Sequence, residues 1–191
     1  SWQRNTHQIV INEIGDKEIY SKRNLALNSL DKTDNQYFFP HAYASFVTRN
    51  EPVFEARNAI DGVIENSCHG EYPYHSWSAG AKTDMDFSLD FGKKVEIEKI
   101  LFYLRADFPH DTYWDSLSVI FDDKSSLRAN FMKTADCQEV ILEKPIVTRT
   151  IKLCDFTQAV NPPSFAALTQ IQVIGKYIKE DFSKMEVRQA A

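Results

Sequence analysis

The chain has 191 residues, of which 43% are apolar and 26% charged, a balance that is ordinary for a soluble domain with a sizeable core. Its formal net charge is −5 and no basic run exceeds two residues, which excludes a nucleic-acid surface because phosphate binding needs clustered Lys and Arg. The sequence holds no apolar stretch of about 18 residues, so no membrane span is expected.

The cysteines Cys68, Cys137 and Cys154 are widely spaced and form neither a CxxC pair nor a disulfide framework. We expect small buried thiols in a reducing compartment. The chain starts at Ser1 and not at Met, which fits a removed leader or a piece of a larger multidomain protein. Localisation therefore stays open between the cytoplasm and a secreted or cell-surface position.

The N-terminal part contains one alternating run, residues 8–14, which predicts a short strand closed by a turn at Gly15-Asp16. We expect residues 1–23 to be an added strand or the remnant of an upstream segment. Residues 24–175 form the main domain in this prediction, and residues 31–36 are a polar loop within it. Residues 176–191 are a polar tail that can hold a short helix.

Short apolar runs separated by turn residues fill the main domain, which is typical of an antiparallel sandwich. Phe87, Leu89 and Phe91 alternate with polar residues, so their strand should bury one face. Residues 92–94 and 122–125 are hairpin-like breaks, and residues 51–60 are a helical candidate. The expected strands are 41–47, 87–91, 95–105, 117–121, 126–132, 140–142, 146–153 and 168–174. The sequence thus predicts an all-β jelly roll with short helical additions.

Two loops, residues 68–77 and 105–115, combine rings, charges and histidines around a proline. A sugar needs this mixture, because its ring stacks on an aromatic face while its hydroxyls bind carboxylate and guanidinium groups. Loops at the end of a rigid scaffold are also the usual place for binding residues. The candidate ligand-binding residues are His69, Glu71, Tyr74, Trp77, Arg105, Asp107, His110, Asp111, Tyr113 and Trp114, with Tyr72 as a further ring.

A structural interpretation of the same loops stays open, in which Trp77 and Phe108 plug the ends of the sandwich and the charges satisfy loop backbone. The binding hypothesis requires the two loops to meet at one rim of the folded domain. Arg105, Asp111 and Glu71 would then hold hydroxyls, with Trp77 or Trp114 stacked on the sugar ring.

Catalysis has little support in the sequence. No GxSxG nucleophile elbow and no glycine-rich phosphate loop are present, and no catalytic residue is assigned. A glycan hydrolase using Asp107, Asp111 or Glu71 remains an alternative, because paired carboxylates can cleave glycosidic bonds. A protein-interaction or adhesion module of the same fold is the other alternative.

No zinc-like spacing such as HExxH or paired CxxC occurs. Residues 58–67 offer a carboxylate in Asp61, a tight bend at Gly62 and oxygen donors up to Ser67, the ligand types that calcium takes. An ordinary Asp-Gly turn explains the same residues.

Five segments in this order resemble the galactose-binding-like group, which includes discoidin and coagulation-factor type C domains and carbohydrate-binding modules. They are Asn58-Ala59-Ile60-Asp61-Gly62, Ser76-Trp77, Phe87 to Gly92, Ile97 to Tyr103 and Leu168 to Gly175. The resemblance covers about residues 40–175. Residues 105–111 look like an extended strand-end loop of a bacterial subgroup that is usually labelled carbohydrate-binding.

This resemblance implies an eight-stranded jelly roll with a ligand site on loops at one end, and in many members a structural calcium. The calcium would be held by Asp61 and by an acidic residue of the last strand. Gln170 stands at that last-strand position instead, which removes a charge. The leading hypothesis is a non-catalytic carbohydrate-binding domain.

Overall fold

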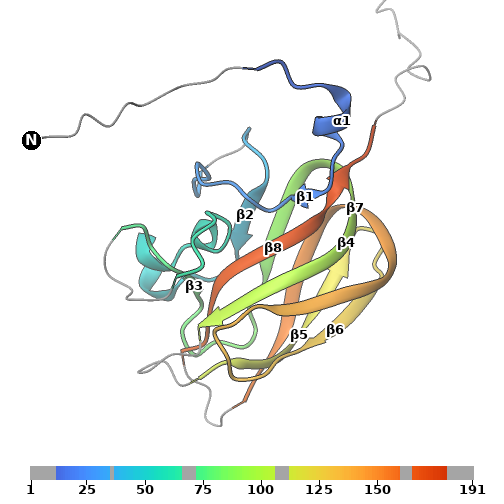
Figure 1. The fold of residues 1–191 in the computed structure, drawn as a ribbon. Helices are drawn as coiled ribbons and strands as arrows, with labels where there is room; N and C mark the ends of the chain where they lie inside the picture. The colour runs from blue at the N-terminus through green and yellow to red at the C-terminus, as the bar shows by residue number, and fades with distance from the viewer. Residues whose placement is uncertain (1–11, 35–36, 66–71, 106–111, 160–164, 180–191) are drawn as a thin grey trace, which may run out of the picture.

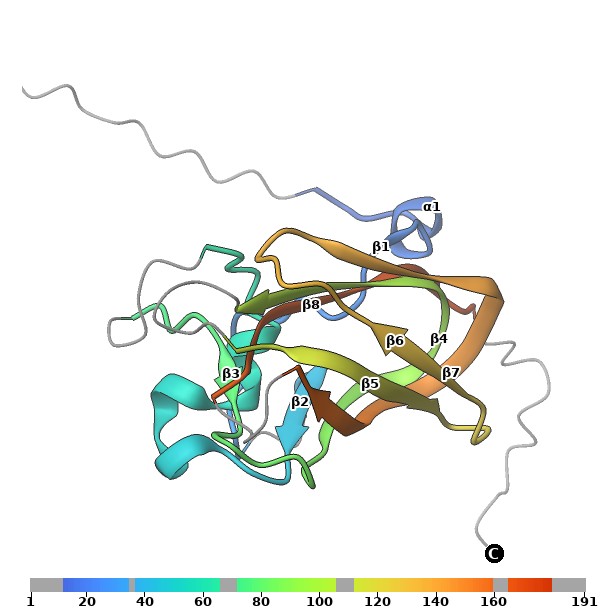
Figure 2. The same cartoon turned by 90° about the horizontal axis from the view of Figure 1, so that it is seen from below.

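The computed structural model describes residues 12–34, 37–65, 72–105, 112–159 and 165–179, and its core is an antiparallel β-sandwich (Figures 1 and 2). The strands are β1 (Arg23–Asn24), β2 (His41–Ala44), β3 (Trp77–Ser78), β4 (Phe87–Arg105), β5 (Trp114–Phe121), β6 (Ser126–Asn130), β7 (Gln138–Gln158) and β8 (Ala167–Tyr177). The expected jelly-roll fold class is confirmed.

The strands are hydrogen-bonded in the order β1-β8-β4-β7-β5-β6, while β2 pairs with β4 and β3 pairs with β8. The long strands β4 and β7 bend as they cross the molecule, as Figure 2 shows for β7. The first part of β4 pairs with β2, whereas its second part pairs with β8. Bent strands therefore connect the two layers, and the apolar core lies between them.

The bend in β4 corrects the expectation of a hairpin at residues 92–94. Gly92 has a φ of +76°, and its N–H donates to Oδ1 of Asp90 at 2.7 Å. The register shifts between Asp90 and Val95, after which β4 continues beside β8. A glycine in the left-handed region thus makes a bulge inside one strand, because the apolar alternation resumes at Val95 and holds the chain in the sheet. The two expected strands 140–142 and 146–153 likewise form one strand, β7.

The helical candidate at residues 51–60 forms only short 3₁₀ turns, η2 (Pro52–Phe54) and η3 (Ala56–Ala59), after η1 (Thr48–Asn50). Glu55 is extended between η2 and η3, which interrupts a longer helix. One α-helical turn, α1 (Asp16–Ile19), replaces the turn expected at residues 15–16. Strand β8 runs to Tyr177, so it includes the first residues of the expected C-terminal helix.

Other parts of those predictions lie outside the described residues, namely most of the strand at 8–14 and the tail from 180 onward. Within the ranges described, none of the helices has the length and apolar character needed to cross a membrane. Cys137 is an exposed free thiol and Cys154 a buried one, and Cys68 is not among the described residues.

Candidate functional site

The described ends of the two predicted loops lie at the same end of β8. Trp77 and Leu104 both pair with Leu168, and the ring centroids of Trp77 and Trp114 are 5.5 Å apart. The loop tips, residues 66–71 and 106–111, lie outside the described residues. The roles of His69, Glu71, Asp107, His110 and Asp111 therefore stay predictions.

The rings of Trp77 and Trp114 are 0% and 1% exposed, and each packs against Phe156. The Nε1–H of Trp77 donates to the carbonyl of Phe46 at 3.1 Å. A ring that is enclosed on both faces cannot stack on a sugar, so the structure corrects the stacking role expected for these two residues. They are core residues, because inward positions on β3 and β5 carry them into the sandwich.

Arg105 is also buried at the end of β4, and it has an interaction partner, so its guanidinium is not an open group at the surface. Tyr113 is half-buried against the core. Tyr74 is half-buried too, but its ring meets Tyr72 edge to face, with centroids 5.7 Å apart and an interplanar angle of 87°. Among the predicted residues that the structure describes, Tyr74 is thus the one in ring contact with an exposed aromatic side chain, that of Tyr72.

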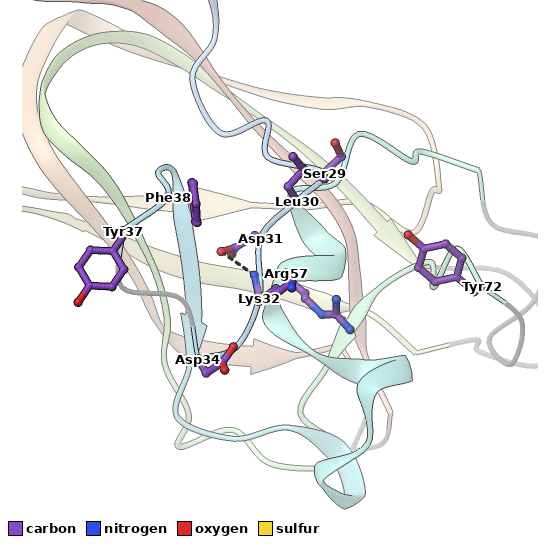
Figure 3. Close-up of a pocket in the computed structure, with 9 residues that line it drawn as sticks. All are labelled: Ser29, Leu30, Asp31, Lys32, Asp34, Tyr37, Phe38, Arg57 and Tyr72. Atoms are coloured by element: carbon purple, nitrogen blue, oxygen red, sulfur yellow. Dashed lines mark hydrogen bonds between the residues drawn. The ribbon is translucent and has the colours of Figure 1, made fainter.

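A cavity of about 570 Å³ lies beside this tyrosine pair (Figure 3). Its walls come from the loop at residues 29–34, from Tyr37 and Phe38, from η3 through Arg57, and from Tyr72. The lining residues are Ser29, Leu30, Asp31, Lys32, Asp34, Tyr37, Phe38, Arg57 and Tyr72. The volume is within the range of ligand pockets, roughly 300–1,000 Å³.

Asp31 holds the loop wall of this cavity in place. Its Oδ1 accepts from the Lys32 N–H at 3.0 Å and lies 2.8 Å from Nδ1 of His41, while Oδ2 accepts from the Ala42 N–H at 2.9 Å. The carboxylate is buried and so joins the loop to the start of β2. Asn28 adds a second connection, because its Nδ2 donates to the Pro40 carbonyl at 2.7 Å.

Arg57 provides the cationic group of the cavity. Its Nε donates to Oε2 of Glu55 at 2.5 Å, and the paired side chains are 30% and 20% exposed. Figure 3 shows the guanidinium in the space between the loop wall and Tyr72. An arginine held by a carboxylate on one side can still present its terminal N–H groups to a ligand hydroxyl.

Exposed rings border the same space. Tyr72 is 79% exposed, and Tyr37 and Phe38 are exposed on the opposite wall. The sequence signal for this wall was the aromatic run Tyr37-Phe38-Phe39 next to a polar loop and Pro40. The sequence predicts a polar loop at residues 31–36 but not the cavity, because the contact of Asp31 with β2 joins residues 11 apart.

Two side-chain oxygens that the resemblance assigns to a calcium ion accept hydrogen bonds from backbone N–H groups instead. Oε1 of Gln170 accepts from the Gly62 N–H at 3.3 Å, and Oδ1 of Asp61 accepts from the Val63 N–H at 2.8 Å. No group of three or more His, Cys, Asp or Glu gathers anywhere in the described part of the chain. Ser67 lies outside that part. Gln170 here ties the Asp-Gly turn to the last strand by a hydrogen bond.

Asp61 is half-buried, and loss of solvation raises the pKa of its carboxyl to about 6, against the smaller effects of the Val63 N–H and the Arg57 charge. The folded state thus holds this proton more tightly than the unfolded chain, whose aspartate pKa is about 4. Between about pH 4 and 6 the folded chain binds more protons, so the contribution of Asp61 to the free energy of unfolding falls as the pH rises.

We therefore expect Asp61→Asn to remove this part of the pH dependence while keeping the oxygen that accepts from Val63. Urea unfolding at intervals from pH 4 to 7 measures it, as the difference in unfolding free energy between variant and wild type. The variant should gain relative stability as the pH rises. If the difference in unfolding free energy did not change between pH 4 and 7, the Asp61 carboxyl would have the same pKa in the folded and unfolded states.

Several solved structures are similar to this chain. A fucose binding module of Streptococcus pneumoniae matches with a TM-score of 0.57 at 14% identity, over 86% of this chain and 100% of that one. The family 32 carbohydrate-binding module of C. perfringens NanJ, in complex with galactose, matches with a TM-score of 0.53 at 17% identity, over 70% and 91%. Chitosan-binding module 1 from a chitosanase/glucanase of Paenibacillus sp. IK-5 matches with a TM-score of 0.52 at 16% identity, over 80% and 99%.

No protein-family model matches the sequence, and no curated protein sequence does either. At identities of 14–17% the structural matches establish the fold. Together with the strand order and the bent strands β4 and β7, they show that this chain has the galactose-binding-like jelly-roll fold of these modules.

Proposed function

We propose that this chain is a non-catalytic carbohydrate-binding domain and that the cavity around Arg57 receives the sugar. The observation that carries the proposal is the convergence of exposed rings and a fixed guanidinium on one cavity. The similar structures support it, since their names describe binding of fucose, galactose and chitosan by those proteins.

The cavity has the two features that a sugar needs, an aromatic ring face and side chains that hydrogen-bond to hydroxyls. Tyr72 offers a ring face for the C–H groups of a pyranose, and its ring lies edge to face with that of Tyr74. Arg57, Lys32 and Asp34 supply donors and acceptors for hydroxyls. One stacked ring and a few hydrogen bonds correspond to millimolar to micromolar affinity, about −4 to −8 kcal/mol.

The cavity is not built for hydrolysis. Of its two carboxylates, Asp31 is buried with both oxygens already accepting hydrogen bonds. That leaves Asp34, whereas glycosidases require two acidic groups across the scissile bond. The acids considered from the sequence, Glu71, Asp107 and Asp111, lie outside the described residues and remain a separate hypothesis.

Arg57→Gln tests this proposal. We expect it to weaken sugar binding by about 10- to 100-fold, since a hydrogen bond to a charged group contributes about 1.5–3 kcal/mol. Arg49→Gln is the matched control, because Arg49 also pairs with a glutamate two residues away, Glu51, but does not line the cavity. A glycan array identifies the ligand, and calorimetry then compares the two variants, with thermal unfolding as a check on folding.

Equal binding by wild type and Arg57→Gln would contradict the position of the site. Asp111→Ala distinguishes the alternative position on the predicted loops, since only a ligand held there would lose affinity in that variant. Absence of binding to every mono- and oligosaccharide on the array would contradict the function itself.

A further inference from the structure

Arg57 lines four hollows that share walls with one another. Besides the main cavity they are a recess of about 30 Å³ toward Tyr74 and Asp61, an open hollow of about 360 Å³ over Lys32, Thr33 and Asp34, and a hollow of about 250 Å³ beside β2. The main cavity and the open hollow share Lys32, Asp34 and Arg57. The open hollow and the one beside β2 share Thr33, Glu55 and Arg57. We call this track the Arg57 groove.

Each end of the Arg57 groove has an exposed tyrosine. Tyr72 is at the first end, in the main cavity, and Tyr43, 59% exposed on β2, is at the other. Phe46 also lines the second end, but the ammonium of Lys82 lies over its ring at 4.7 Å from the centroid. Tyr43 is therefore the more exposed ring at that end.

The Arg57–Glu55 ion pair lies between these ends, since it lines both hollows on the β2 side. A guanidinium beside a carboxylate gives adjacent donors and acceptors, which matches the vicinal hydroxyls of a sugar unit. Exposed rings on either side of one polar pair suit different units of the same sugar chain.

The charges of the groove argue against an anionic ligand. The basic lining residues are Lys32 and Arg57, whereas the acidic ones are Asp34, Glu55, Asp61 and Asp31, whose carboxylate faces His41. A polyanionic glycan would need an excess of cationic groups along its path, which this groove does not have.

We infer that the Arg57 groove binds a neutral oligosaccharide over several consecutive units, with Tyr72 and Tyr43 as its two stacking platforms. This inference rests on the proposed function and adds the ligand class. A monosaccharide would fill only the Tyr72 end, whereas a longer chain would also reach Tyr43 across the Arg57–Glu55 pair.

Calorimetry with N-acetylated chito-oligosaccharides and cello-oligosaccharides of one to six units, and with heparin-derived hexasaccharides, tests the inference. For the neutral series that binds, we expect affinity to rise with length and heparin to bind more weakly. Tyr43→Ala should weaken hexasaccharide binding about tenfold and leave monosaccharide binding unchanged, whereas Tyr72→Ala should weaken both. Tyr43→Phe should retain hexasaccharide binding, because the ring is kept.

Phe165→Ala is the matched control, since Phe165 is similarly exposed, at 53%, and lines none of the four hollows. Equal affinity for one unit and six, or full hexasaccharide binding by Tyr43→Ala, would overturn the oligosaccharide inference and leave the proposed function standing. Tighter binding of heparin than of every neutral chain would overturn the ligand class. No binding of any saccharide would instead overturn the proposed function.

Discussion

Replacing Trp77 with alanine is expected to lower the free energy of unfolding by about 3–5 kcal/mol, the usual loss when a buried aromatic ring is deleted. The ring is fully buried and packs against Phe87, Trp114 and Phe156, with centroid distances of 5.1, 5.5 and 5.8 Å. The substitution also leaves the carbonyl of Phe46 without the indole N–H donor. Urea unfolding followed by intrinsic fluorescence measures the loss.

Tyr72→Ala is the matched control for Trp77→Ala, because it deletes a ring from the same stretch of chain at an exposed position. We expect its unfolding free energy to stay within about 0.5 kcal/mol of wild type while sugar binding weakens. The two variants thus distinguish a ring that stabilises the core from a ring that binds the sugar. The opposite pattern, in which Trp77→Ala folds normally and loses binding, would restore the role that the sequence predicted for Trp77.

The sandwich could be predicted from the sequence because its strands are amphipathic at short range. The alternation of Phe87, Leu89 and Phe91 is a local property, and those side chains are indeed buried in β4. The ends of the strands could not be predicted in the same way. Whether Gly92 makes a hairpin or a bulge depends on the pairing of β4 with β8, which the local sequence does not contain.

The position of the cavity could not be predicted for a related reason. Trp77 and Tyr72 are five residues apart in one aromatic loop, yet one is enclosed in the core and the other exposed. The sequence predicts a ligand contact for both rings, because aromatic composition does not reveal burial. The opposite wall depends on Asp31, whose partners His41 and Ala42 lie on β2. Only the folded arrangement shows that a polar loop with this anchor borders the same space as Tyr72.

Replacing Asp31 with alanine should therefore both destabilise the protein and weaken sugar binding. The N–H of Ala42 is buried and would lose its acceptor, as would Nδ1 of His41, and a buried donor left unpaired costs about 1–3 kcal/mol. The loop at residues 29–34 would then keep only the Asn28–Pro40 hydrogen bond as its connection to the start of β2, so the wall opposite Tyr72 would be held less firmly. Thermal unfolding and calorimetry on the same preparation measure the two effects.

Asp34→Ala is the matched control, since Asp34 is an exposed carboxylate of the same loop and lines the same cavity. We expect Asp34→Ala to keep wild-type stability and to weaken binding by no more than about tenfold, the loss of one hydrogen-bonding group at an exposed position. Asp31→Ala should cause a larger loss of stability and of sugar affinity than Asp34→Ala, because the buried carboxylate of Asp31 holds the cavity wall in place whereas Asp34 only lines it. If Asp31→Ala kept full stability with unaltered binding, the loop would not depend on its connection to β2, and a cavity built on that loop could not be the sugar site.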